Sequence, residues 1–183
     1  MNSQLEESLE TILANYQGSF GAKTFLEETT QTDLLMDVFG LTQEIKSGNK
    51  QYWGRELGKC WERLIIATFR ALVPDWTPGI NDKGEEICDL TGKGDAIDAK
   101  YRVGSGDSGT LGKFRRNAVK LLEMDLRPVM LILRGDNLPA AMSACASGGW
   151  VVIVGDDSFT YLRERTGFDL EQWLRDRREK FAV

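Results

Sequence analysis

The sequence predicts an α/β (α+β) fold with a mixed central β-sheet, helices on its faces and extra helices at the N-terminus. Between residues 54 and 155 the apolar patterns run in the order helix, hairpin, helix, strand, helix, strand. A hairpin pairs its strands antiparallel, whereas strands separated by helices pair in parallel, so the sheet is expected to be mixed. A chain of 183 residues can bury one core without disulfides. We therefore expect one domain, with a helical region at 1–49, the core at 54–155 and terminal helices at 156–183.

The longest predicted helix runs from Lys50 to Val73 and ends before a proline, which cannot donate a backbone hydrogen bond. Its apolar stripe consists of Leu57, Trp61, Leu64, Ile65, Thr68 and Leu72. Periodicity predicts further helices over residues 5–13, 25–46, 138–147, 157–164 and 169–181, the second of them broken near Gly40. A helix capped by Thr110 is expected to reach Asp125, and buried strands are expected at 128–133 and 150–154.

The stretch from Glu85 to Arg102 predicts the central hairpin. Two short runs lie on either side of Lys93-Gly94, a pair typical of a two-residue hairpin turn. Such a turn sets the register of the two strands, because Gly92 must then pair with Asp95. The face that contains Cys88, Leu90, Ile97, Ala99 and Tyr101 is apolar and is expected to lie against the core.

The opposite face of this hairpin is predicted to hold Asp89, Asp98 and Lys100. The register places the two carboxylates directly across from each other, about 5 Å apart at Cβ. Mg²⁺ typically takes one or two protein carboxylates and completes its shell with water and phosphate, and the Ala99 carbonyl could add a ligand. An ammonium group beside this ion can orient an attacking water and offset negative charge in a transition state. The alternative is an exposed ion pair between Asp98 and Lys100 without a catalytic role.

These residues resemble a known nuclease motif. Asp89, eight further residues and then Asp98-Ala99-Lys100 resemble the PD-(D/E)xK signature of a superfamily that includes most type II restriction endonucleases. The resemblance implies that Asp89 and Asp98 bind Mg²⁺, for which Mn²⁺ can substitute, and that Lys100 is the catalytic lysine. Cys88 stands where the family often has proline, and Asp98 replaces the commoner glutamate, but no needed functional group is lost. The order of elements from Gly54 to Gly155 is similar to the restriction-endonuclease-like core.

Two assignments within this motif have alternatives. Asp95 could replace Asp89 as the first acid, although it lies three residues from Asp98 on one strand and should face the opposite way. The helix segment around Glu62 is similar to the first core helix of many such nucleases, whose glutamate reaches the metal site. Glu62 is therefore a candidate further acid that supports a metal ion or its water, and Glu56 is the weaker competitor.

The composition excludes several other chemistries. The chain contains no histidine, so a Ser-His-Asp triad, histidine-bound zinc and an imidazole general base are excluded. Its three cysteines, Cys60, Cys88 and Cys145, are odd in number and lack metal-ligand spacing, which favours a reduced, cytoplasmic chain. No signal peptide, membrane span or organic cofactor is expected. Carboxylate and lysine chemistry is compatible with all of these observations.

Basic residues concentrate just after the predicted site, although the formal net charge of the chain is −5. From Lys100 to Lys120 there are six basic residues and one acidic residue. The Gly- and Ser-rich segment 103–109 and the next helix are therefore expected to contact DNA. The candidate contacts are Arg102, Ser105, Ser108, Lys113, Arg115 and Arg116. The alternative is an ordinary solvated helix face.

With the resemblance, these features predict a Mg²⁺-dependent type II restriction endonuclease that hydrolyses phosphodiester bonds of double-stranded DNA at a short sequence. Cleavage of both strands of a palindrome favours a homodimer. The candidate interface consists of the helices outside the core, at 5–13 and 25–46, and the last helix with Trp173 and Phe181. The alternatives are a repair or junction-resolving nuclease of the same superfamily and a non-catalytic DNA-binding protein on this fold.

Overall fold

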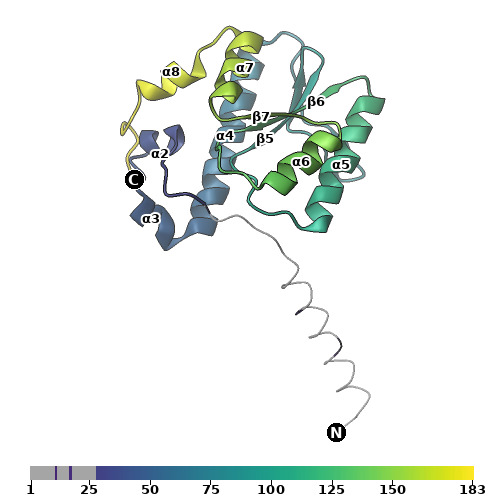
Figure 1. The fold of residues 1–183 in the computed structure, drawn as a ribbon. Coiled ribbons are helices and arrows are strands. Elements are labelled where there is room, and N and C mark those ends of the chain that lie inside the picture. The colour runs from purple at the N-terminus through teal and green to yellow at the C-terminus, as the bar shows by residue number, and fades with distance from the viewer. Residues whose placement is uncertain (1–10, 12–16, 18–27) are drawn as a thin grey trace.

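The central element is a five-stranded sheet in the order β1-β4-β5-β6-β7 (Figure 1). The computed structural model describes residues 11, 17 and 28–183, so nearly all of the helix expected at 5–13 lies outside the described residues. The strands are β1 (Thr77–Pro78), β4 (Leu90–Gly92), β5 (Asp95–Lys100), β6 (Arg127–Ile132) and β7 (Val151–Val154). The pairs β1–β4 and β4–β5 are antiparallel, whereas β5–β6 and β6–β7 are parallel. The prediction of a mixed sheet is confirmed.

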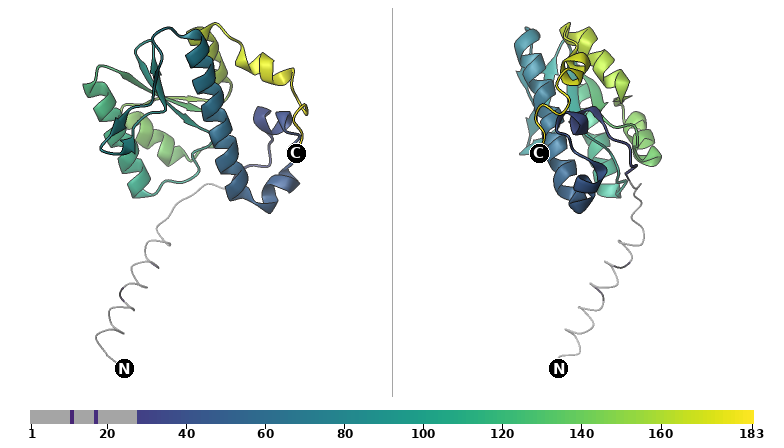
Figure 2. Two further views of the ribbon diagram at one scale, coloured as in Figure 1. Left: turned by 180° about the vertical axis from the view of Figure 1, so that it is seen from behind. Right: turned by 90° about the vertical axis from the view of Figure 1, so that its left-hand side faces the viewer.

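Helices cover both faces of this sheet (Figure 2). One face packs against α2 (Leu34–Val38), α4 (Lys50–Leu72), α7 (Asp156–Thr166) and α8 (Leu170–Arg175). The other face packs against α5 (Ser108–Glu123) and α6 (Pro139–Ser147), while α3 (Gln43–Gly48) directly precedes α4. No helix in the described part of the chain is both long and apolar enough to cross a membrane.

Several predicted boundaries were wrong. Asp107, not Thr110, caps α5, because its carboxylate accepts a hydrogen bond from the Thr110 N–H and the helix therefore begins earlier. The run before β4 contains an unpredicted small hairpin of β2 (Asn81–Asp82) and β3 (Glu85–Glu86). The helix expected at 169–181 ends at Arg175. In the segment expected at 25–46, the described residues form α2 and α3, and the predicted break lies at Gly40, which has φ +59°.

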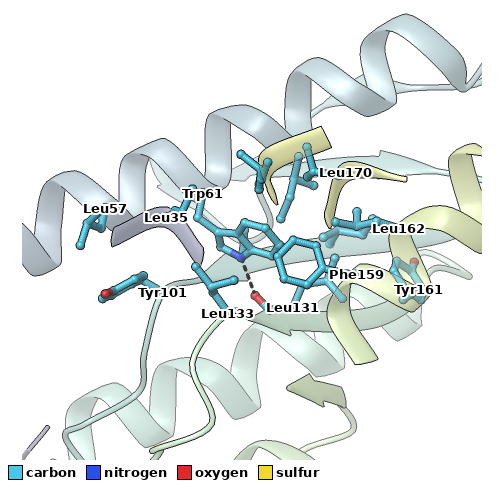
Figure 3. Close-up of a cluster of buried hydrophobic side chains, with 14 of the residues drawn as sticks. Leu35, Leu57, Trp61, Tyr101, Leu131, Leu133, Phe159, Tyr161, Leu162 and Leu170 are labelled. Atoms are coloured by element: carbon cyan, nitrogen blue, oxygen red, sulfur yellow. Dashed lines mark hydrogen bonds between the residues drawn. The ribbon is translucent and has the colours of Figure 1, made fainter. Parts of the chain in front are cut away.

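Trp61 lies at the centre of the core on the α4 side of the sheet (Figure 3). Its indole is fully buried, donates a hydrogen bond to the Leu131 carbonyl at 3.3 Å and meets the Phe159 ring edge-on. The predicted α4 stripe is correct through Thr68, but Leu72 is 47% exposed and Phe69 is buried in its place. Burial of these large side chains fixes α4 against β5 and β6.

Cys88 is a further correction. It was expected on the same face as Leu90, but it packs in the cluster on the α5–α6 side, whereas Leu90 packs against α4. The reason is that β4 begins only at Leu90, and Asp89 lies in a bend where the strict alternation of an extended strand is lost. This bend determines where the Asp89 side chain points.

A buried network of charged side chains joins the segment before α4 to the ends of β5 and β6. Arg134 is only 4% exposed and donates to Asp33 at 2.9 Å and to Asp136 at 2.8 Å. Tyr101 donates to Asp33 and accepts a hydrogen bond from buried Lys46 at 2.7 Å. The network was not predicted, because no local pattern links residues that are up to 101 positions apart in the sequence.

We predict that Arg134→Ala lowers the free energy of unfolding by about 3 to 5 kcal/mol, because removal of one partner leaves buried carboxylates without compensation. The matched control is Arg163→Ala, whose ion pair with Asp169 is exposed and is expected to contribute no more than about 1 kcal/mol. Urea unfolding of both variants measures the difference. Equal losses would contradict a structural role for the network.

Candidate active site

Asp98 and Lys100 lie two residues apart on β5 and point to the same side of the sheet. The Lys100 Nζ is 2.8 Å from Asp98 Oδ1, and the Lys100 side chain is 32% exposed. Besides burial, both charges affect the pKa of the Cys145 thiol on α6: Asp98 raises it and Lys100 lowers it. The pair therefore lies on the side of the sheet that α5 and α6 cover. One ammonium and one carboxylate are thus held together within reach of solvent.

The hairpin register predicted from the turn is confirmed, with Gly92 opposite Asp95 and Leu90 opposite Ile97. Asp89 departs from this register, because its backbone N–H donates to the Ile97 carbonyl at 2.8 Å, so the expected direct pairing of Asp89 with Asp98 is not formed. Its carboxylate Oδ2 accepts a hydrogen bond from the Ala99 N–H at 2.6 Å. A side-chain oxygen therefore replaces a backbone acceptor at this point, and it holds the Asp89 carboxylate beside the strand that contains Asp98.

Asp89 is the most perturbed acid of this group. Burial and, after it, the nearby charge of Asp98 raise the pKa of Asp89 to about 7, although Lys100 and the Ala99 N–H act in the opposite direction. Burial lowers the pKa of Lys100, but attraction to Asp98 and Asp89 outweighs this effect and leaves it raised. At neutral pH the group therefore contains a firmly protonated lysine and a carboxyl that a nearby cation would help to ionise.

Glu62 is the acidic residue of α4 whose charge acts on this group. Its charge contributes to the raised pKa of both Asp89 and Lys100, and the side chain is half-buried. Glu56, the weaker candidate, instead pairs with Arg55 and Lys59 at the surface. The structure thus places Glu62 near the other acids, and its catalytic role remains a prediction.

Asp95 lies on the other face of β5, as the strand alternation predicted. It is only 3% exposed and binds Arg127 through both oxygens, at 2.7 and 2.9 Å. Arg165 lies 2.8 Å from it, and the Tyr161 hydroxyl donates to it. Its lone pairs are occupied by these donors, so the geometry favours Asp89 over Asp95 as the first acid of the motif.

The donor set of the site is compatible with Mg²⁺. Two carboxylates from adjacent strands match the one or two protein ligands that this ion commonly takes. Among the residues that the structure describes, no three Asp, Glu or Cys side chains are arranged as a preformed metal site, so Glu62 does not complete such a cluster. Cys145 also lies near Asp98 and Lys100, Glu86 lies near Cys88, and neither was singled out from the sequence as a site residue. No local pattern would have identified them.

The candidate DNA contacts are distributed unevenly. Arg102 donates to the Asp136 carbonyl at 2.9 Å, Ser105 hydrogen-bonds to Asp107, and Lys113 pairs with Glu85 at 3.1 Å. By contrast, Ser108, Arg115 and Arg116 are exposed on α5. Within the described part of the chain, neither of these two arginines forms an ion pair, so α5 remains the more accessible basic surface.

Comparison with known protein families, with curated proteins and with solved structures finds no match to this chain. What the site does must therefore be inferred from its own chemistry.

We predict that Asp89→Asn stabilises the metal-free protein. Because the pKa of Asp89 is raised on folding, the wild-type carboxyl costs stability as the pH rises from about 4 to about 7, and the full cost persists above 7. Asparagine mimics the neutral acid, so the gain is expected to be on the order of 2 to 4 kcal/mol at pH 8 and to shrink towards pH 4.

The matched control for Asp89→Asn is Asp95→Asn, which should have the opposite effect. It removes a charge that two arginines surround, so we expect a loss of about 2 kcal/mol at pH 8. Urea unfolding at several pH values measures both variants. A gain for Asp89→Asn that does not change with pH would show that this carboxyl does not titrate near 7.

Proposed function

We propose that this protein is a Mg²⁺-dependent nuclease of the PD-(D/E)xK type that hydrolyses phosphodiester bonds of double-stranded DNA. The observation that carries the proposal is that Asp89, held against the Ala99 N–H of β5, lies close enough to Asp98 and Lys100 for their charges to act on it. A structural ion pair needs only Asp98 and Lys100. A second, buried carboxylate with a raised pKa destabilises the fold unless a cation compensates it, which supports a functional site.

Each side chain has its own task in this proposal. Mg²⁺ bound by Asp89 and Asp98 would supply Lewis-acid activation of water and of the scissile phosphate. Asp98 also accepts a hydrogen bond from Lys100 and thereby positions the ammonium. Lys100 can then orient the attacking water and offset the negative charge that grows in the transition state. The negative charge of Glu62 helps to keep Lys100 protonated.

We further propose that the protein is a type II restriction endonuclease and cuts at a specific short sequence. The net charge of −5 disfavours indiscriminate attraction to DNA. The exposed basic residues Arg115 and Arg116 lie on α5, which packs on the same side of the sheet as the acids. Exposed positive charge on the side of the acids supports DNA binding at the site.

Incubation of a plasmid of known sequence with Mg²⁺ is expected to give discrete fragments. Lys100→Ala and Asp98→Ala should each slow cleavage by at least about 10²-fold, because they remove groups that act on the transition state. Their thermal unfolding should stay close to wild type, because both side chains lie outside the two apolar clusters.

Other results of the plasmid experiment would overturn parts of the proposal. Cleavage of branched DNA alone would indicate a junction-resolving nuclease, and intact DNA in every condition would indicate a binding protein. Wild-type rates for Lys100→Ala would show that the site is assigned wrongly.

We also propose a homodimer that joins through the outer face of α4 and α8. An apolar groove of about 360 Å³ lies there and includes Trp173, one of the residues expected at the interface. Its lining residues are Leu64, Ala67, Thr68, Ala71, Leu72, Phe168, Leu170 and Trp173. An apolar surface of this kind is typical of an interaction site.

Light scattering at micromolar concentration is expected to give twice the single-chain mass. Leu72→Glu should reduce the measured mass to that of a single chain, because the substitution places a charge in the apolar groove. The control is Leu122→Glu on α5, where a leucine of similar exposure lies away from the groove and the mass should not change. A single-chain mass for wild type, with and without DNA, would exclude the dimer.

A further inference from the structure

A hollow of about 440 Å³ opens between the first turns of α4 and the end of β5. Its lining residues are Glu28, Lys50, Gln51, Gly54, Tyr101 and Arg102. Two of them directly follow Lys100 in the chain, so the hollow begins where the candidate active site ends.

The hollow and the active site share one helix. Gly58 of α4 lies opposite Tyr101, and Phe69 lies against Gly92, so α4 runs antiparallel to β5. Glu62 is four residues C-terminal of Gly58 and eight residues C-terminal of Gly54. At 1.5 Å per residue the separation of Glu62 from Gly54 is about 12 Å along the helix axis.

The charges around the hollow favour an anion. Among the described residues that line it, Glu28 is the one acid, and Lys46 and Arg134 both pair with it. Lys50 is exposed and forms no ion pair with any residue that the structure describes. The N-terminal end of α4 adds positive potential at the same place, because the peptide dipoles of a helix are aligned.

Gly54 keeps the hollow open. Glycine is the least favourable residue for a helix interior apart from proline, yet Gly54 lies inside a helix of 23 residues. A Cβ at this position would meet no atom within 4 Å, so packing within the chain does not require glycine here. The missing side chain leaves space beside Lys50 and Arg102.

We propose that this hollow binds the phosphodiester backbone of the DNA strand that passes through the active site, an inference that rests on the proposed function. Tyr101 and Arg102 line the hollow and directly follow Lys100, so the contact is expected on a phosphate near the bond that is cut. Lys50 supplies the charge at this position, and Gly54 supplies the room for the strand.

The test of the charge is binding of a mixed-sequence DNA duplex in Ca²⁺ at several salt concentrations. Lys50→Ala should lower the slope of log affinity against log salt by about one, as expected for one lost phosphate contact. The matched control is Lys93→Ala in the β4–β5 turn, at the opposite end of β5, where the same change of charge should leave the slope unaltered. Equal slopes for the two variants would overturn the proposal.

Gly54→Gln tests whether DNA binding needs the space beside Gly54, because glutamine fills the hollow without a change of charge. We expect weaker DNA binding than for wild type, with a melting temperature that is equal or higher because glutamine is the better helix former. Gly54→Ala should give an intermediate loss of affinity, because its side chain is smaller. Wild-type affinity for Gly54→Gln would overturn the proposal.

Binding and cleavage together separate this proposal from the proposed function. If wild type cuts DNA but Lys50→Ala and Lys93→Ala behave alike, the nuclease assignment stands and the hollow is not a binding site. If wild type binds DNA without cutting it and Lys50→Ala lowers the slope, the hollow is supported as a phosphate site and the nuclease assignment fails.

Discussion

The register of the β4–β5 hairpin is the constraint on which the rest of the structure depends. Its turn places Lys93 at φ +52° and Gly94 at φ +79°, the left-handed conformations that a tight hairpin turn requires. β5 is the central strand of the sheet, and its residues are buried except Asp98 and Lys100, which are partly exposed. A shift by one residue would exchange its two faces, so that Asp98 would enter the core and Ile97 would leave it. This register is therefore the one that keeps Ile97 in the apolar cluster around Trp61 and Asp98 in the acidic site.

Buried charge in this protein occurs in two groups with different properties. Around Arg134 and Lys46, each buried cation has carboxylate or hydroxyl partners, and the group ties the segment before α4 to the sheet. Around Asp89, burial is the main reason that the pKa of this carboxyl is raised to about 7, and the negative charges there also exceed the positive ones. The first group is satisfied and stabilises the fold. In the second group the negative charges lack enough positive partners within the chain, which is typical of a functional site that binds a ligand.

The position of the second group follows from an irregularity in the sheet. β4 is only three residues long, and the bend at Asp89 directs its carboxylate to the Ala99 N–H instead of into the solvent. The β5 edge beyond Ile97 is therefore not covered by a longer β4, and Lys100 keeps contact with solvent. A continuous strand in place of the bend would cover the site, so the bend at Asp89 gives solvent access to Lys100.

The sequence by itself determined the mixed sheet, the extent of α4, the hairpin register and the common face of Asp98 and Lys100. All of these follow from short-range physics: apolar periodicity, a proline that ends a helix, and a two-residue turn. It did not determine the side of Cys88, the β2–β3 hairpin, the true cap of α5 or the partners of Asp95. Only the tertiary structure decided these, because each depends on competition between burial and hydrogen bonding among residues far apart in the chain. The Arg134 network is the clearest case, since charges more than 100 residues apart pair only after the sheet has brought them together.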